Sequence, residues 1–248
     1  MNIVGVIPAR YASTRFPGKP LVMINGKTMI QRVYEQAVLC SALSKVVVAT
    51  DHDSIEKHVI AFGGHVIMTS ETHRSGTERC QEVMERFAAE GVYYDGVINI
   101  QGDEPFLNPQ QIVEVADCLQ QPGTTIATLI KKINSREELD NPNVVKAIIN
   151  QKGKALYFSR SPIPYVRGKT AEKWLDNTVF FKHVGIYGYL SEVLKKLVSL
   201  PVSPLESAES LEQLRWLENG FQIQTQITAF ESASIDTPAD LLKITNNR

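Results

Sequence analysis

Short apolar runs alternate along the first half of the chain with segments in which apolar positions recur at helical spacing. The continuous runs predict buried strands at 2–7, 45–50, 65–68, 96–100 and 125–133. The helical spacing predicts helices at 28–40, 53–62, 77–90 and 109–119. Strands without polar alternation are typical of a parallel sheet that helices cover on both faces. The pattern therefore predicts an α/β fold in which ligands bind at the carboxyl ends of strands.

The pattern changes after residue 140, where the predicted strands are separated by irregular segments. These strands are expected at 144–149, 155–158 and 184–189, and they predict an antiparallel insertion or a small second lobe. Beyond them we expect a polar surface loop at 169–177, an amphipathic helix at 205–219, a strand at 222–230 and a last helix from Pro238.

Composition narrows the class of protein. The 248 residues carry 26 basic and 27 acidic side chains, a net charge of -1 that argues against a nucleic-acid surface. The 3 cysteines form no C-x-x-C pair, which suits a reducing compartment. No window approaches the roughly 18 apolar residues of a membrane span, and residues 1–20 lack the pattern of a secretory signal. We expect a cytoplasmic protein with no nucleic-acid or membrane partner.

The strand at 2–7 leads into a basic loop that contains Arg10, Ser13 and Lys19. Backbone N–H groups of such a loop can point at phosphate oxygens, and the two cationic side chains can neutralise them. Neither a Walker A sequence nor G-x-G-x-x-G is present, so a solvated surface loop remains an alternative. The position directly after a core strand favours a polyphosphate site.

Two separate segments each place an aspartate where it could bind a metal ion. Asp103 follows the strand at 96–100 in the sequence QGDEP, and Asp236 lies in IDTPAD. A carboxylate at a strand tip beside a polyphosphate is a natural ligand for Mg²⁺. The alternatives are an ordinary turn at the first position and a helix cap by Thr237 before Pro238 at the second. The cap leaves Asp236 unexplained.

Two segments of the second half carry side chains that favour substrate binding. Arg160 in YFSRSPIP has the chemistry to pair with a substrate carboxylate. His183 and Tyr187 alternate along one strand and so share a face. A turn stiffened by prolines and an ordinary strand with a hydrogen-bonded histidine remain open as alternatives.

Further candidates occur near predicted helix ends. Glu212 and Gln213 belong to a helix whose leucines are core positions, so a solvated helix face is the alternative for them. Ser75 and Gly76 indicate a helix N-cap, which does not exclude base recognition by the same backbone. The segment 51–53 has the D-x-D pattern of sugar transferases that use nucleotide sugars, and we interpret it as a loop and helix cap.

With these segments in view, the chain resembles the 3-deoxy-manno-octulosonate (Kdo) cytidylyltransferases, or CMP-Kdo synthetases, from end to end. The motifs that carry the resemblance are IPARYASTRFPGKPL, VATDHDSI, SGTERC, NIQGDEPF, ALYFSRSPIPY, KHVGIYGY, SPLESAESLEQLR and IDTPADL. It implies a Rossmann-like nucleotide-diphospho-sugar transferase fold, with a mostly parallel mixed sheet and an inserted antiparallel lobe. It also implies one domain over 1–248, with a CTP-binding core at roughly 1–135 and 222–248 and a sugar-binding and dimerisation lobe at roughly 136–221.

The same resemblance implies an activity and roles for residues. A Mg²⁺-dependent homodimer would transfer the cytidylyl group of CTP to the anomeric hydroxyl of Kdo, releasing pyrophosphate, for lipopolysaccharide synthesis in the cytoplasm. Catalytic roles would fall to Arg10, Lys19, Asp103 and Asp236, the last two as metal ligands. Nucleotide contacts would come from Arg10, Ser13, Lys19, Ser75, Gly76 and Gln101. Sugar contacts would come from Arg160, His183, Tyr187, Glu212 and Gln213.

One departure from the family pattern bears on the sugar. Residues 165–167 read Tyr-Val-Arg where the family pattern has an aromatic residue, an aspartate and an arginine, so an acidic residue is missing there. A cytidylyltransferase for 8-amino-Kdo or neuraminate therefore stays an alternative. A non-catalytic nucleotide-binding regulator is a second alternative, although a protein that only binds a nucleotide would not need both Asp103 and Asp236.

Overall fold

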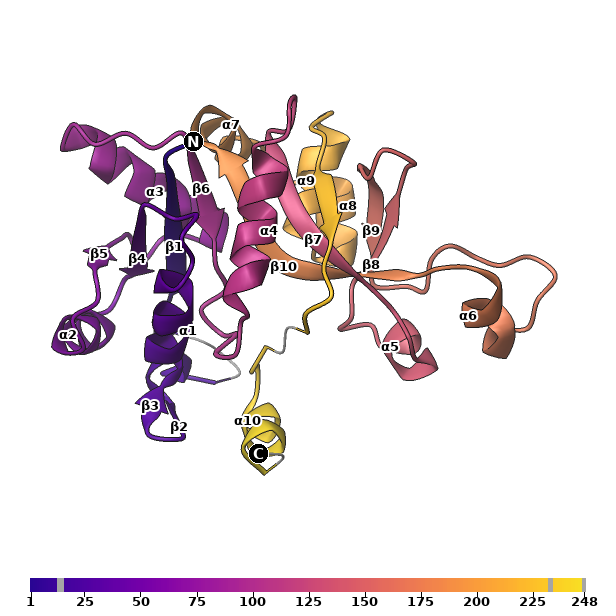
Figure 1. Cartoon of the computed structure of the whole chain (residues 1–248), viewed down its shortest axis with the longest axis horizontal. Coiled ribbons are helices and arrows are strands. Elements are labelled where there is room, and N and C mark those ends of the chain that lie inside the picture. The colour runs from indigo at the N-terminus through magenta and orange to yellow at the C-terminus, as the bar shows by residue number, and fades with distance from the viewer. Residues whose placement is uncertain (13–15, 232–233, 247–248) are drawn as a thin grey trace.

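The computed structural model describes residues 1–12, 16–231 and 234–246. A twisted central sheet crosses the molecule in the order β11-β7-β10-β6-β1-β4-β5 (Figure 1). Strands β1, β4, β5 and β6 are mutually parallel, β11 is parallel to β7, and β10 runs antiparallel between β6 and β7. The predicted α/β fold with a mostly parallel mixed sheet is confirmed. The strands span Ile3–Ala9 (β1), Lys45–Thr50 (β4), Val66–Met68 (β5), Gly96–Asn99 (β6), Ile126–Lys132 (β7), Phe181–Leu190 (β10) and Gln224–Ile227 (β11).

Helices cover both faces of this sheet, which explains why the strands lack polar alternation. Helices α1, α2 and α4 bury apolar side chains against one face, and α3, α7 and α9 bury theirs against the other. Val6 and Ile7 of β1 point into these two separate cores. The helices span Met29–Val38 (α1), Asp53–Ala61 (α2), Gly76–Ala89 (α3), Pro109–Leu119 (α4), Ser191–Val198 (α7) and Glu212–Glu218 (α9).

The predicted antiparallel insertion extends the main sheet. Strand β8 (Lys146–Ile149) pairs antiparallel with both β10 and β9 (Ala155–Ser159). Strands β8 and β9 lie to one side of the central sheet in Figure 1. A separate pair, β2 (Met23–Ile24) and β3 (Lys27–Thr28), was not expected from the pattern.

The prediction of one helix at 205–219 is wrong. Two helices, α8 (Pro204–Glu209) and α9, are separated at Ser210, whose φ of 52° places it in the left-handed region and ends α8. The apolar spacing of Leu205, Ala208, Leu211 and Leu214 continues across this break and hides it. The last helix, α10 (Pro238–Asn246), begins at Pro238 as expected.

The segment predicted as a polar surface loop at 169–177 contains a 3-10 turn, η2 (Ala171–Lys173), and a short helix, α6 (Trp174–Asn177). Trp174 is buried and stacks on Phe180, in a small core separate from the two that flank the sheet. Helix α5 (Arg136–Asp140) completes this projecting part of the molecule (Figure 1). Burial of one large aromatic ring among polar neighbours is the reason that the loop prediction fails here.

No helix in the described ranges is both long and apolar enough to cross a membrane.

Candidate functional site

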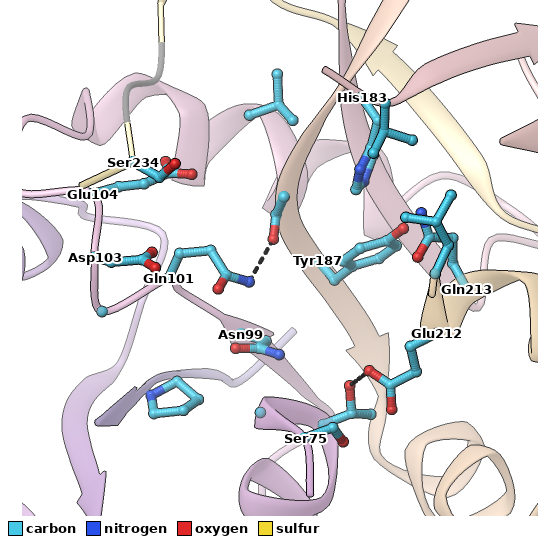
Figure 2. Close-up of a pocket in the computed structure, with 18 of the residues that line it drawn as sticks. Ser75, Asn99, Gln101, Asp103, Glu104, His183, Tyr187, Glu212, Gln213 and Ser234 are labelled. Carbon is cyan, nitrogen blue, oxygen red and sulfur yellow. Dashed lines mark hydrogen bonds between the residues drawn. The ribbon is translucent and has the colours of Figure 1, made fainter. Parts of the chain in front are cut away.

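A cavity of about 770 Å³ lies at the carboxyl ends of β1 and β6, where an α/β sheet is expected to bind its ligand. One wall carries Lys19, Asp103 and Asp236, and the opposite wall is made by β10 and α9. Figure 2 shows the labelled side chains of both walls pointing toward the space between them. The cavity thus joins segments from the first and last parts of the chain.

Lys19 brings the two predicted metal ligands together. Its Nζ lies 2.7 Å from Asp103 Oδ2 and 3.2 Å from Asp236 Oδ1. The backbone N–H of Ile235 also donates a 3.0 Å hydrogen bond to the carbonyl oxygen of Asp103, which fixes the two loops directly to each other. Carboxylates from distant parts of the chain therefore converge on one cationic group.

Glycines allow the basic loop after β1 and the acidic loop after β6 to approach each other closely. A Cβ on Gly102 would lie 2.6 Å from the carbonyl oxygen of Pro8, so only glycine fits where the tip of β6 meets the tip of β1. Gly18 has a φ of 70°, and its N–H donates to the carbonyl of Tyr11 at 3.0 Å. This turn places Lys19 at the start of a 3-10 turn, η1 (Lys19–Leu21), facing the acidic loop.

The amino terminus of α3 forms the floor of the cavity. Ser75 caps the helix by accepting a 3.2 Å hydrogen bond from the N–H of Glu78, as the sequence predicts. Gly76 lies against Asn99, where a Cβ would come within 3.2 Å of the amide nitrogen. Gln101 bridges to the other wall, because its Nε2 donates to the carbonyl oxygen of Gly185 at 2.7 Å (Figure 2).

Burial holds two side chains of β10 uncharged. His183 Nε2 lies 3.1 Å from Thr128 Oγ1, and burial lowers the pKa of this histidine to about 4. Burial also raises the pKa of Tyr187 well above its usual value. The two rings lie 5.2 Å apart, centroid to centroid, and both line the cavity. At neutral pH this wall offers a neutral imidazole and a neutral phenol.

Glu212 and Gln213 are not on a solvated helix face, and that alternative is wrong. Gln213 is buried, and Glu212 accepts hydrogen bonds from Thr77 Oγ1 at 2.8 Å and from Arg215 Nη2 at 3.0 Å. Burial raises the pKa of Glu212 above its usual value, and these two partners act to lower it. The break at Ser210 turns this part of α9 toward the cavity, opposite Asp103 in Figure 2.

Arg160 does not line the cavity in the described structure. Its Nε donates to the carbonyl of Glu209 at 2.7 Å, Nη2 to the carbonyl of Ser210 at 3.3 Å, and Nη1 to the carbonyl of Pro142 at 3.1 Å. The guanidinium therefore ties the segment before β8 to the turn between α8 and α9. Its predicted contact with a sugar carboxylate stays a prediction.

The remaining candidates have simple placements. Arg10 is exposed at the mouth of the cavity, and Ser13 lies outside the described residues. Asp51 of the D-x-D pattern pairs with Arg79 at 2.7 Å. His52 caps α2 by accepting from the N–H of Ser54, which confirms the loop and helix cap.

Sequence patterns alone missed several residues that line the cavity. Asn99 Oδ1 and Trp216 Nε1 are buried and face no hydrogen-bond partner within the part of the chain that the structure describes. A polar residue ending the apolar strand β6 was the available signal for Asn99. Lys131 and Lys182 also line the cavity, although no motif or periodicity in the sequence predicts that either residue does so. Unpartnered buried polar atoms of this kind indicate a site that a polar ligand completes.

A polar cavity at the strand ends, with a basic loop after β1 and two acidic tips, is typical of a nucleotide-binding α/β enzyme. Residues 4–227 match the family described as "Cytidylyltransferase". The chain belongs to the cytidylyltransferase family and is thus a nucleotidyltransferase.

Named relatives cover nearly the whole chain. It is 53% identical over 247 residues to the 3-deoxy-manno-octulosonate cytidylyltransferase of Parabacteroides distasonis, covering 98% of this chain and 96% of that protein. It is 47% identical over 244 residues to the enzyme of the same name from Thermodesulfovibrio yellowstonii, covering 97% of this chain and 96% of that protein. The resemblance inferred from the motifs is confirmed.

Solved structures agree on the fold. A CMP:2-keto-3-deoxy-manno-octonic acid synthetase complexed with CTP superimposes with a TM-score of 0.91 at 44% identity, covering 100% of this chain and 98% of that one. A 4-diphosphocytidyl-2C-methyl-D-erythritol synthase from Anaerococcus prevotii shares only the fold, with a TM-score of 0.64 at 11% identity over 99% of this chain and 97% of that one.

Proposed function

We propose that this chain transfers the cytidylyl group of CTP to the anomeric hydroxyl of Kdo, giving CMP-Kdo and pyrophosphate. The observation that carries the proposal is the meeting of Asp103 and Asp236 at Lys19, on the edge of a cavity whose far wall is polar and buried. Relatives of that name match over nearly the full chain, and the structural relative is described as a complex with CTP. Both support the same substrates here.

The donor set at the acidic loops fits Mg²⁺. Two carboxylates already share one ammonium group, so they converge as two ligands of a single cation would. In the described part of the chain no cluster of three or more His, Cys, Asp or Glu side chains is placed to hold a metal, so substrate oxygens would complete the shell. When bound, Mg²⁺ would neutralise phosphate charge and lower the pKa of the attacking hydroxyl. Asp103 and Asp236 would hold it.

Cationic groups near the mouth would bind the triphosphate. Lys19 exchanges its carboxylate partners for phosphate oxygens, and Arg10 adds a second cation that stabilises the departing pyrophosphate. Ser13 is assigned to the same loop. Ser75, Gly76 and Gln101 would contact the nucleotide from the floor of the cavity. Phosphoryl-type transfer needs such positioning and charge neutralisation more than covalent help.

The opposite wall would orient the sugar. A neutral His183 can donate to or accept from a sugar hydroxyl, and Tyr187, Glu212 and Gln213 add polar atoms that are already fixed by packing. Preorganised groups of this kind lose little entropy when the substrate binds. Arg160 supports the same wall through the three carbonyls that it holds.

The division of the chain follows the same proposal. The core at 1–135 and 222–248 would bind CTP, and the lobe at 136–221 would bind the sugar and form a homodimer contact. Exposed apolar side chains on the lobe, such as Leu156 and Tyr165, support this contact. CTP is a cytoplasmic nucleotide, so the proposed reaction places the enzyme in the cytoplasm, where its product would serve lipopolysaccharide synthesis.

The test is pyrophosphate release from CTP in the presence of Mg²⁺ and each of three sugars: Kdo, 8-amino-Kdo and neuraminate. We expect the highest kcat/KM with Kdo. A preference for either other sugar would replace the substrate, and no release with any of them would leave a nucleotide-binding regulator.

A further inference from the structure

Strand β10 is irregular where it passes the cavity. Its register against β7 skips Gly185 and Ile186, which form a bulge. A bulge leaves backbone carbonyls without their ladder bonds, so other donors must supply them. The hydroxyl of Thr128 on β7 donates to the carbonyl of Ile186 at 2.8 Å and is 3.3 Å from that of Val184. The amide of Gln101 donates to the carbonyl of Gly185 at 2.7 Å (Figure 2). Side chains therefore hold the bulge in place.

Thr128 also contacts a candidate site residue. It is fully buried, and its Oγ1 lies 3.1 Å from Nε2 of His183. A hydroxyl group has a single proton to donate and lone pairs to accept with. The proton lies toward the carbonyl of Ile186, because two oxygen atoms only 2.8 Å apart repel each other unless a proton lies between them. The Thr128 oxygen must therefore accept a hydrogen bond from His183.

This contact determines which nitrogen of His183 carries a proton. The imidazole is neutral, because burial lowers its pKa to about 4 and its ring packs 5.2 Å from the rings of both Phe158 and Tyr187, centroid to centroid. A neutral imidazole has a proton on one nitrogen and a lone pair on the other. Nε2 donates to Thr128, so Nδ1 has the lone pair. His183 lines the cavity, and its Nδ1 forms no hydrogen bond within the described ranges.

We propose that Thr128 is a positioning residue that fixes His183 in the Nε2–H tautomer, so that Nδ1 meets the substrate only as a hydrogen-bond acceptor. Thr128 is not among the described residues that line the cavity, so it acts through the imidazole. An acceptor in this wall favours a substrate group that donates, such as a hydroxyl, and disfavours one that only accepts, such as an ether oxygen. This selectivity deepens the proposed function and rests on it, whereas the tautomer does not.

The tautomer is tested by nuclear magnetic resonance on protein that is isotopically labelled at the ring nitrogens of its histidines. Protonated and unprotonated ring nitrogens differ in chemical shift, and His183→Leu assigns the signals of His183 by their loss. We expect the proton on Nε2 in wild type and in Thr128→Ser, which keeps the hydroxyl group. Thr128→Val removes the acceptor, so it should move the proton toward Nδ1. A proton on Nδ1 in wild type, or an unchanged tautomer in Thr128→Val, would overturn the proposal.

The effect on the reaction is tested by pyrophosphate release, with KM measured separately for Kdo and CTP. We expect Thr128→Val to raise KM for Kdo about tenfold or more and to leave KM for CTP within about twofold. Thr128→Ser should restore KM for Kdo. The matched control is Thr225→Val, which removes a hydroxyl group from the register partner of Thr128 on β11, where it donates to the carbonyl of Gly153 at 2.8 Å. Equal rises of KM for Kdo in Thr128→Val and Thr225→Val would contradict a role through His183.

A double-mutant cycle separates action through His183 from support of the fold. In a His183→Leu background, Thr128→Val should not change KM for Kdo further, because the group that it positions is already absent. A further rise of about tenfold in that background would show that Thr128 acts by another route. If Thr128→Val does not fold, Thr128→Ala takes its place in both measurements.

Failure of the proposed function is recognised separately, because wild-type protein would then release no pyrophosphate from CTP and Kdo. The magnetic resonance measurement needs no substrate, so in that case it alone decides the proposal. A proton on Nε2 that depends on the Thr128 hydroxyl would support the positioning role even then. The same tautomer with and without that hydroxyl would contradict it.

Discussion

The two walls of the cavity handle polar groups in different ways. On the wall of the acidic loops, Lys19, Asp103 and Asp236 are partly exposed and hold one another through ion pairs that a charged ligand can exchange. On the opposite wall, His183 and Glu212 are half-buried but form no ion pair with the acidic loops, and burial shifts their pKa values toward the neutral form. The first wall is suited to phosphates and a cation, whereas the second is a preorganised surface for hydroxyl groups. Substitutions in the first wall should therefore cost activity, and those in the second should also cost stability.

The largest effect is expected at the acidic loops. Asp103→Asn and Asp236→Asn should each lower kcat at least about a hundredfold, or about 3 kcal/mol of transition-state stabilisation, because each removes a charged metal ligand. The thermal midpoint should change little, because both side chains are partly exposed. Steady-state kinetics and thermal melts check this, with the exposed Asp117→Asn as control. Wild-type turnover by both variants would refute the metal assignment.

Behind the opposite wall, Arg215→Met should mainly reduce stability. Arg215 is buried and pairs with Glu206 at 3.2 Å and Glu212 at 3.0 Å, so its removal leaves two carboxylates unpaired. We expect the free energy of unfolding to fall by about 3 kcal/mol. Urea denaturation measures it. Arg86→Met is the control, since its half-exposed pair with Glu82 should be worth less than about 1 kcal/mol; equal losses in both variants would remove the contrast between buried and exposed pairs.

His183 should make the stability of the protein depend on pH. Its pKa is about 4 in the folded state against 6.5 in the unfolded chain, so the unfolded state binds the extra proton between these values. Stability from this group is complete above pH 6.5 and is lost as the pH falls toward 4. Between pH 7 and pH 5, wild type should lose up to about 2 kcal/mol more than His183→Gln. Denaturant titrations at both pH values test this, with exposed His65→Gln as control; identical pH dependence in wild type and His183→Gln would show that the histidine is not held neutral.

The smallest effect is expected for Arg160→Lys. A lysine keeps the charge but cannot reach three carbonyls in fixed directions, so the turn between α8 and α9 loses part of its support. We expect a loss of about 1 kcal/mol, which lowers the thermal midpoint by about 2–4 °C. An unchanged midpoint would mean that these three bonds do not hold the wall in place.

Sequence patterns predict the first wall well, for a physical reason. Parallel strands end at one edge of a sheet, so the loop after β1 and the loop after β6 had to lie together once both strands were recognised. Asp236 was harder, because nothing in the periodicity brings it to Asp103. Only its lack of a role in the helix cap marked it, and the backbone bond from Ile235 to Asp103 shows how the two segments meet.

The second wall was predicted less completely. His183 and Tyr187 were found because alternation along one strand is a local property. The turn at Ser210 was missed because the apolar spacing from Leu205 and Ala208 to Leu211 continues across it, and the burial of Gln213 was missed for the same reason. The pairing of Lys131 with Lys182 depends on the register between β7 and β10, which the periodicity of either strand alone does not encode.

The most direct test of the account is the binding of Mn²⁺, a spectroscopic substitute for Mg²⁺, measured by electron paramagnetic resonance in the presence of CTP. The account predicts that wild-type protein binds the ion and that Asp103→Asn and Asp236→Asn each lose at least about tenfold in affinity, or about 1.4 kcal/mol. Binding of Mn²⁺ by both variants with the affinity of wild type would contradict it.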